Sequence, residues 1–315
     1  MTRSILTWRI HGEDLVGTLH EPTTIPSERG PRFQDLGVLL LNAGAAPRAG
    51  NSDLSVHIGE RLAAAGIPVF RFDFAGLGDS TGATPEDKCG YWESVVEGRN
   101  DAATLALVRR IKRQFGLSRL IVGGLCSAAL PALRVADRDA RDVAGLLLLE
   151  PALHMTIPRV GSDPAAIAER VNTSRLRRAF SLREWLLFLT GESKVARAAR
   201  PLRAPLLSAL RASAGHTLPR DANVTLIAHW QSCLLRGIPA LAVVAEGQRI
   251  DGDIPRILHT FSGPCRALVD IVRVPRTNHI LTSGGARDVV LDAAERWVQT
   301  HFAEAASRGR THAGA

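Results

Sequence analysis

The chain has 315 residues, of which 45% are hydrophobic and 22% are charged. These are ordinary fractions for a soluble globular protein, and they exclude general disorder. The net charge of +8 comes almost entirely from scattered arginines, because lysine occurs only at Lys88, Lys112 and Lys194. We therefore expect no nucleic-acid binding, although the charge would suit an acidic partner such as a carrier protein or a phosphate-bearing cofactor.

The spacing of the cysteines and the composition of the N-terminus argue against further classes of protein. The four cysteines, Cys89, Cys126, Cys233 and Cys265, are far apart and form no CxxC pair. This spacing argues against a zinc site, a thioredoxin-like motif and a disulfide framework. The first ten residues contain arginines and no long apolar stretch, so we expect neither a signal peptide nor a membrane span. The sequence predicts a cytoplasmic protein without a metal or cofactor site.

Short apolar runs bounded by turn residues predict strands, and longer segments with helical periodicity predict helices. Strands are expected at Ser4–Ile10, Leu15–His20, Gly37–Leu41, Pro68–Phe72, Leu120–Val122, Val143–Leu149, Pro239–Ala245 and Ala267–Val274. Helices are expected at Leu54–Ala65, at Trp92–Phe115, in a short segment through Leu133, and at Arg287–Phe302. The first two strands should form a hairpin. The later alternation of strand and helix predicts a mostly parallel, doubly wound α/β sheet of about eight strands.

One long segment interrupts this alternation. Between about Pro151 and Arg236 there are helical blocks, such as Leu182–Leu189 and Asn223–Leu235, but no convincing strand. We expect a helical lid inserted between two strands of the core. The predicted organisation is listed by residue number: 1–150 for the N-terminal part of the core, 151–236 for the lid, 237–306 for the C-terminal part of the core and 307–315 for a frayed tail.

The segment around Cys126 is typical of a nucleophile elbow, in which an apolar strand runs into small residues and then into a helix. The sharp turn forces the nucleophile into strained backbone geometry, so the residues two before and two after it must be small. Gly124 and Ala128 satisfy this requirement around Cys126. If Ser127 were the nucleophile, Leu125 would occupy a crowded position. Cys126 is therefore the candidate nucleophile, and the alternative is a buried cysteine that acts as a small hydrophobe.

A histidine in the loop after the last strand is the expected base of such a site. His279 lies at that place, just before the closing helix, and the order of nucleophile then histidine agrees with it. A cysteine beside a histidine can form a thiolate–imidazolium pair, which attacks acyl carbons near neutral pH. The oxyanion formed in that attack needs backbone N–H donors, for which we propose Ser127 and Ala45. The alternatives are an ordinary loop histidine at 279 and a plain tight loop around Ala45.

A resemblance supports this interpretation. The strand and loop at 69–82, VFRFDFAGLGDSTG, resemble the segment after the first helix of α/β hydrolases, and Asn42-Ala43-Gly44 follows the preceding strand. With the elbow and the late histidine, the chain resembles the serine aminopeptidase-like branch of the α/β-hydrolase fold. Within that branch it is most similar to hydrolases associated with bacterial exosortase and biosynthetic gene clusters. The resemblance implies hydrolysis of acyl or peptidyl bonds.

This chain lacks a carboxylate at the position where the family has the acid that orients the histidine. Relatives place an aspartate shortly after the penultimate strand, where this chain has Gln248. Three carboxylates remain as candidates, and we rank Asp251 first, then Glu150, then Glu246. A cysteine nucleophile tolerates a weak third member better than a serine does, because it ionises readily when it is paired with histidine.

The sequence therefore predicts a cysteine-nucleophile acyl hydrolase or acyltransferase that acts on an ester or thioester through an acyl-Cys126 intermediate. Bacterial secondary metabolism is a plausible setting, with a small-molecule or carrier-protein-bound acyl substrate. Trp185 and Arg178 in the lid are candidate substrate-binding residues, although such a stripe is more often a packed helix with a solvated arginine face. The rival hypothesis is a non-catalytic or impaired hydrolase-fold protein with a binding or scaffolding role, suggested by Gln248 and by the absent serine.

Overall fold

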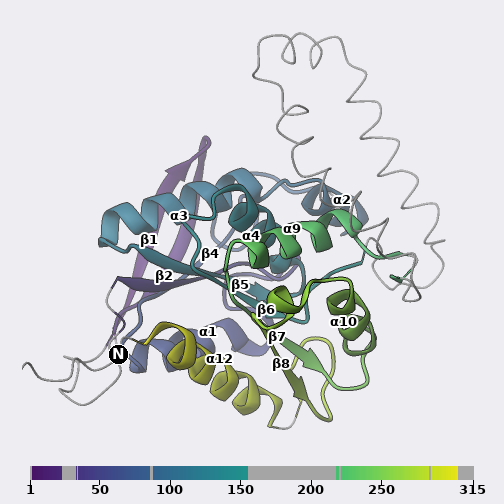
Figure 1. Ribbon diagram of the computed structural model, residues 1–315. Coiled ribbons are helices and arrows are strands. Elements are labelled where there is room, and N and C mark those ends of the chain that lie inside the picture. The colour runs from purple at the N-terminus through teal and green to yellow at the C-terminus, as the bar shows by residue number, and fades with distance from the viewer. Residues whose placement is uncertain are drawn as a thin grey trace, which may run out of the picture.

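A computed structural model gives the fold of the chain (Figure 1). The structure describes residues 2–22, 33, 35–85, 88–154, 218–219, 221–283 and 285–303. The expected segment Leu182–Leu189, the lid residues Arg178 and Trp185, and the tail 307–315 lie outside the described residues. Within the described part of the chain, no helix is long and apolar enough to span a membrane.

The described chain forms one eight-stranded sheet in the order β1-β2-β4-β3-β5-β6-β7-β8. The strands are β1 (Arg3–Ile10), β2 (Glu13–His20), β3 (Leu36–Leu40), β4 (Val69–Phe72), β5 (Arg119–Leu125), β6 (Gly145–Leu149), β7 (Ala240–Ala245) and β8 (Val269–Val274). β1 and β2 form the expected antiparallel hairpin, and β2 also pairs antiparallel with β4. All other neighbours are parallel. The predicted mostly parallel α/β-hydrolase sheet is confirmed.

Helices cover both faces of the sheet, as the doubly wound prediction requires (Figure 1). One face carries α3 (Asp101–Phe115), α4 (Ala129–Arg138) and α9 (Val224–Leu235), whose apolar residues share one buried cluster. The opposite face carries α1 (Leu54–Ala64) and α12 (Ala286–Phe302), which share the second cluster. The central strands β3, β5, β6 and β7 are almost entirely buried, which explains their continuous apolar sequences.

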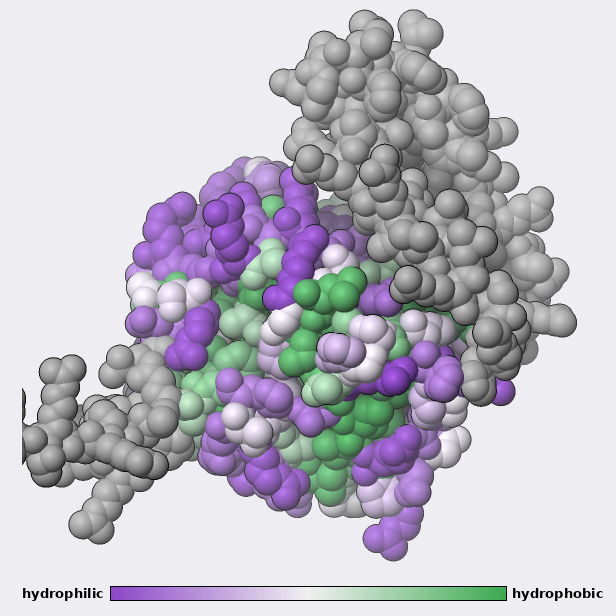
Figure 2. Space-filling model, in the orientation of Figure 1, coloured by the Kyte–Doolittle hydropathy of each residue, from purple (hydrophilic) through white to green (hydrophobic). Residues whose placement is uncertain are grey.

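The edge strand β8 differs from these central strands. Its burial pattern shows only Val274 fully buried, while Val269, Ile271 and Val272 remain partly exposed. Figure 2 shows apolar residues at the surface around this strand, between hydrophilic residues of the neighbouring helices. An edge strand has a neighbour on one side only, so its side chains receive less cover than those of β7.

The expected single helix over 92–115 is wrong, because the structure contains two helices there. α2 spans Lys88–Val96, and α3 begins at Asp101. Gly98 adopts a φ of 100° between them, a conformation that other residues rarely adopt. The Arg134 guanidinium of α4 donates hydrogen bonds to the carbonyls of Val95 (2.9 Å) and Val96 (3.0 Å). These bonds satisfy carbonyls at the end of α2, so the chain can turn there without leaving polar groups unpaired.

The helix at the end of the predicted lid belongs to the core. Trp230 and Cys233 of α9 are fully buried in the cluster that also contains α4. Residues 224–235 of the predicted lid therefore pack with the core helices. At the other end, His154 forms a β-bridge with Ala222, and the Asn223 N–H donates to the Leu153 carbonyl over 2.8 Å. Residues 153–154 and 222–223 therefore lie side by side.

Two helices between β7 and β8 were not anticipated from the sequence. They are α10 (Arg249–His259) and α11 (Gly263–Arg266). Ile250, Ile254 and Ile257 recur at helical spacing and are buried on one side of α10. Gly252 and Pro255 within the segment conceal this pattern, because both residues are poor in helix interiors. The helix forms because its apolar side packs against the core.

Candidate active site

The elbow geometry places Cys126 at the carboxyl end of β5, where the strand ends at Leu125. Cys126 has a φ of 55°, in the left-handed region, and its side chain is partly exposed. A Cβ atom on Gly124 would lie 2.8 Å from the Leu41 carbonyl oxygen and 2.9 Å from the Ala128 Cβ. Both flanking positions therefore accept only very small residues. This strained turn presents the Cys126 side chain at the edge of the sheet, as a nucleophile elbow does.

His279 lies in the loop that follows β8 and contacts two groups. Its Nδ1 is 2.8 Å from Oε2 of Glu150, and its ring is hydrogen-bonded to the Cys126 side chain. Because Glu150 occupies Nδ1, the Cys126 contact falls to Nε2. Leu281, with a φ of 55°, donates its N–H to the Asn278 carbonyl over 2.9 Å, which tightens the turn around the histidine.

The electrostatics of this contact favour a charged imidazole. The hydrogen bond to Cys126 and then that to Glu150 raise the pKa of His279 from 6.5 to about 10, against the opposing effect of burial. A histidine with this pKa holds its proton throughout the neutral range. The arrangement therefore places a protonated imidazole beside the Cys126 sulfur.

The structure corrects the ranking of the acid. Glu150, which was ranked second, contacts His279, whereas Asp251 pairs with other groups. Asp251 accepts the Gly247 N–H over 3.1 Å and the Arg273 Nε–H over 2.7 Å. Glu246, ranked third, is exposed. The carboxylate that contacts His279 therefore follows β6, whereas Asp251, in the segment after β7, forms an ion pair with Arg273.

Glu150 is fully buried and held from several sides. Its φ of 45° turns the chain sharply after β6, and its N–H donates to the Val243 carbonyl over 2.7 Å. Oε1 accepts the N–H of Ala245 from β7, which leaves Oε2 for His279. The sequence signal was present, because a carboxylate directly after the four leucines of β6 must be buried and must find partners.

Ala45, the expected second oxyanion donor, lies in the loop after β3. Gly44 has a φ of 58°, and its N–H donates to the Ser127 Oγ over 2.6 Å. Ala45 is exposed, and its N–H has no hydrogen-bond acceptor among the described residues. The Ser127 N–H lies in the first turn of a helix, where backbone donors have no intrahelical acceptor. The structure thus ties the loop of Ala45 directly to the residue that follows Cys126.

Two buried side chains, Asn42 and Asp73, hold the loop after β3 in place. Asn42 accepts the Phe74 N–H over 2.9 Å and donates to Asp73 over 3.1 Å. Asp73 also forms an ion pair with Arg48 and accepts the backbone N–H of Asp79 over 3.2 Å. Asp73 therefore holds the loop after β3 and the loop after β4 in shape. It lies outside the Cys126–His279–Glu150 group.

Tyr91 of α2 is a site residue that the sequence analysis missed. Its hydroxyl donates to the Gly44 carbonyl over 3.1 Å, and only 6% of the residue is exposed. The sequence gives one indirect signal, because Tyr91 is the only tyrosine of the chain. Nothing in its spacing indicated contact with a loop 47 residues away.

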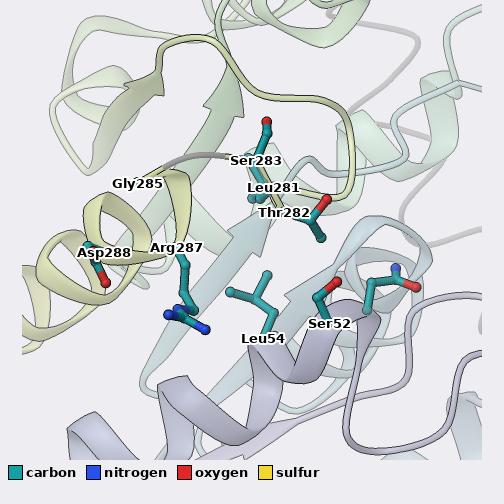
Figure 3. A pocket seen from close by; sticks show the side chains of 9 residues that line it. Ser52, Leu54, Leu281, Thr282, Ser283, Gly285, Arg287 and Asp288 are labelled. Atoms are coloured by element: carbon teal, nitrogen blue, oxygen red, sulfur yellow. The ribbon is translucent and has the colours of Figure 1, made fainter.

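A pocket of about 240 Å³ lies next to the histidine loop (Figure 3). It is formed where the start of α1 meets the loop between His279 and α12. Its lining residues are Asn51, Ser52, Leu54, Leu281, Thr282, Ser283, Gly285, Arg287 and Asp288. None of Cys126, Glu150 and His279 lines it, so this mostly polar pocket is separate from the Cys126–His279 pair.

Solved structures support the fold over nearly the whole chain. DcsB in complex with its substrate analogue is 15% identical, with a TM-score of 0.58, covering 96% of this chain and 100% of that one. The esterase Pf2001 of Pyrococcus furiosus is 14% identical, with a TM-score of 0.56, covering 96% and 92%. The thioesterase domain of the curacin biosynthetic pathway is 17% identical, with a TM-score of 0.50, covering 94% and 99%.

The comparison with curated protein sequences gives no match. Among protein families, the one described as "Serine aminopeptidase, S33" matches residues 37–208, which include β3, the loop of Ala45, the elbow and Glu150. This match covers more than half of the chain and agrees with the sheet order and the elbow described above. The protein belongs to the serine aminopeptidase S33 family, within the α/β-hydrolase superfamily.

Proposed function

We propose that this protein is an acyl-transfer enzyme in which Cys126 is the nucleophile, His279 the general base and Glu150 the acid that orients it. The observation that carries the proposal is the position of His279, which is hydrogen-bonded to both Cys126 and Glu150. Nucleophile, base and orienting acid linked in this order are the functional unit of triad enzymes. The strained elbow at Cys126 supports the same assignment.

The reaction follows from this geometry. With the shared proton already on His279 Nε2, the Cys126 Sγ attacks the carbonyl carbon of an ester or thioester. The resulting oxyanion accepts hydrogen bonds from the N–H groups of Ser127 and Ala45. The bond to the leaving group then breaks, and His279 returns its proton to the departing alcohol or thiol. Water or another nucleophile loses a proton to His279 and attacks the acyl-cysteine, which releases the acyl group and restores the thiol.

Glu150 contributes by orientation and charge. Its carboxylate fixes the His279 ring so that Nε2 faces Cys126, and its negative charge stabilises the imidazolium that forms. Because Glu150 is fully buried, water does not compete for the same oxygen. The Ala245 N–H holds the other oxygen, so the carboxylate keeps one orientation throughout the cycle.

The cysteine favours activated acyl donors. An acyl-cysteine is itself a thioester, so exchange with a thioester donor is nearly balanced in energy, and amines and thiols react with it readily. We therefore extend the proposal to acyl thioesters on a carrier protein or a small thiol, with transfer to an acceptor besides hydrolysis. The net charge of +8 suits an acidic carrier, and the curacin thioesterase shows the same fold in a biosynthetic pathway. A role in bacterial secondary metabolism, with Arg178 and Trp185 contacting the substrate, belongs to this proposal.

Intact-protein mass spectrometry tests the proposal. Wild type and Cys126→Ala are incubated with a panel of acyl thioesters and an aryl ester, and the mass of each protein is followed over time. We expect an acyl increment on wild type that is absent from the alanine variant, and its lifetime with and without added amines separates hydrolysis from transfer. No increment with any donor, together with slow alkylation of Cys126, would favour a binding protein instead.

A further inference from the structure

Hydrogen bonds hold Gly44 at both of its backbone polar groups, the N–H and the carbonyl. The Gly44 N–H donates to the Ser127 Oγ over 2.6 Å, and the Gly44 carbonyl accepts the Tyr91 hydroxyl over 3.1 Å. A Cβ on Gly44 would meet no atom within 4 Å, so the glycine is required for its φ of 58° and not for space. The loop therefore depends on hydrogen bonds to keep this peptide in one orientation.

The carbonyl that Tyr91 holds belongs to the same peptide group as the Ala45 N–H. In a trans peptide the C=O and N–H bonds point in opposite directions, and the described residues contain no cis peptide. A hydroxyl that fixes the Gly44 carbonyl on the α2 side therefore turns the Ala45 N–H away from α2. A hydrogen bond to the carbonyl also polarises the peptide, which strengthens its N–H as a donor.

The surroundings of Tyr91 keep its hydroxyl in the donor role. Asn100, which is 6% exposed, forms a side-chain hydrogen bond to the Tyr91 hydroxyl. Burial raises the pKa of Tyr91, so the phenol keeps its proton at every pH where acyl transfer would be assayed. With Asn100 as its donor, the hydroxyl has the Gly44 carbonyl as the acceptor of its own proton.

We propose that Tyr91 is a positioning residue of the oxyanion hole, which orients and polarises the Gly44–Ala45 peptide so that the Ala45 N–H is ready to receive the oxyanion. This inference rests on the proposed function. Tyr91 acts through Gly44 and touches neither the acyl group nor Cys126 in the reaction described above. Ser127 has a related double role, because its N–H is the first donor and its hydroxyl locks the loop that carries the second.

The test compares two reactions of Cys126 in Tyr91→Phe. Acylation by an aryl ester passes through an oxyanion, whereas alkylation by iodoacetamide is a direct displacement at carbon and forms none. Loss of one oxyanion donor costs roughly 10²- to 10³-fold in other enzymes, so loss of its orientation should slow acylation by about 10-fold. Alkylation should stay within about twofold of wild type. Ser94→Ala is the matched control, because this hydroxyl of α2 donates to the Tyr91 carbonyl and not to the loop.

The outcomes separate this inference from the proposed function. No acylation of wild type would defeat the proposed function itself. Normal acylation of both wild type and Tyr91→Phe would overturn the role of Tyr91 alone. An equal slowing of acylation and alkylation in Tyr91→Phe would show a merely structural role and would also overturn it.

A second measurement keeps the inference testable if Tyr91→Phe does not fold. Because Tyr91 is the only tyrosine of the chain, growth on 3-fluorotyrosine replaces this one phenol with a more acidic donor. A stronger donor should polarise the peptide more, so acylation should be faster than in the unlabelled protein while alkylation is unchanged. Fluorotyrosines of increasing acidity that leave the acylation rate constant would contradict the proposal.

Discussion

Glu150 and Asp251 follow neighbouring parallel strands, yet their surroundings have little in common. Glu150 ends β6 with a φ of 45°, is fully buried, and divides its two oxygens between Ala245 and His279. Asp251 lies in the first turn of α10 and pairs with Arg273, whose side chain is about half exposed. Both are carboxylates within reach of the same edge of the sheet, but only one contacts the histidine.

This difference shows which properties place a carboxylate beside His279. A buried carboxylate must have its oxygens satisfied, and the N–H of Ala245 and the ring of His279 supply those partners. Asp251 instead pairs with a half-exposed arginine, where water weakens the interaction. Position in the chain, on which the first ranking relied, decides less than burial and partners do.

The largest expected effect comes from Cys126→Ala, which removes the nucleophile that both carboxylates were candidates to serve. We expect acyl transfer to fall by at least about 10³-fold, as loss of a triad nucleophile does elsewhere. The assay follows release of an aryl alcohol and the acyl mass increment together. Cys126→Ser is the companion variant, since it keeps a hydroxyl at the elbow and should lose thioester turnover less completely.

Substitution of the two carboxylates tests the comparison directly. Glu150→Gln keeps the shape but loses the charge, and we expect the acylation rate to drop by about 100-fold or more because the imidazolium loses its partner. Asp251→Asn should change the rate by less than about twofold, since its ion pair is remote from His279. Stopped-flow acylation of both variants gives the answer. A greater loss in Asp251→Asn would reverse the assignment.

The pKa of His279 tests the same difference between Glu150 and Asp251. Its imidazole resonance in an NMR titration should give a pKa of about 10 in wild type and a lower pKa in Glu150→Gln and in Cys126→Ala. A folded-state pKa above the unfolded value of 6.5 means that this stabilisation is complete below pH 6.5 and is lost as the pH rises toward 10. The fall in unfolding free energy over that window should therefore be smaller in Glu150→Gln, while Asp251→Asn should behave as wild type.

The smallest expected effect is on stability. Asp251→Asn removes an ion pair with a half-exposed arginine, so it should lower the free energy of unfolding by about 1 kcal/mol or less. Chemical denaturation of wild type and variant measures this difference. A loss of several kcal/mol would mean that Asp251 supports the fold much as a buried charge does, and the contrast with Glu150 would fail.

The alkylation rate of Cys233 serves as a reference for that of Cys126 in the same protein. Burial raises the pKa of the Cys233 thiol, which is packed between α9 and α4, so Cys233 should resist alkylation near neutral pH. Cys126, partly exposed and hydrogen-bonded to His279, should react first. Peptide mapping after a short pulse of iodoacetamide ranks the two thiols.

Local sequence predicted the parts of this protein that local physics controls. Continuous apolar runs identified the buried strands, because a strand covered on both faces has no polar positions. Gly124 and Ala128 identified the elbow, since only small residues fit a turn that places Cys126 at a φ of 55°. The loop position of His279 followed from the order of elements, which fixes where the end of the last strand must lie.

The tertiary structure decided what depends on contacts between distant segments. Glu150 meets His279 across 129 residues of sequence, and Tyr91 meets Gly44 across 47, at separations where no periodicity carries information. The break between α2 and α3 depends on Arg134 of another helix, and α10 forms despite Pro255 because its apolar side is buried. The sequence by itself determined the sheet, the elbow and the nucleophile–histidine pair as candidates. Burial and hydrogen-bond satisfaction, which exist only in the folded chain, selected the acid and the group that holds the oxyanion loop.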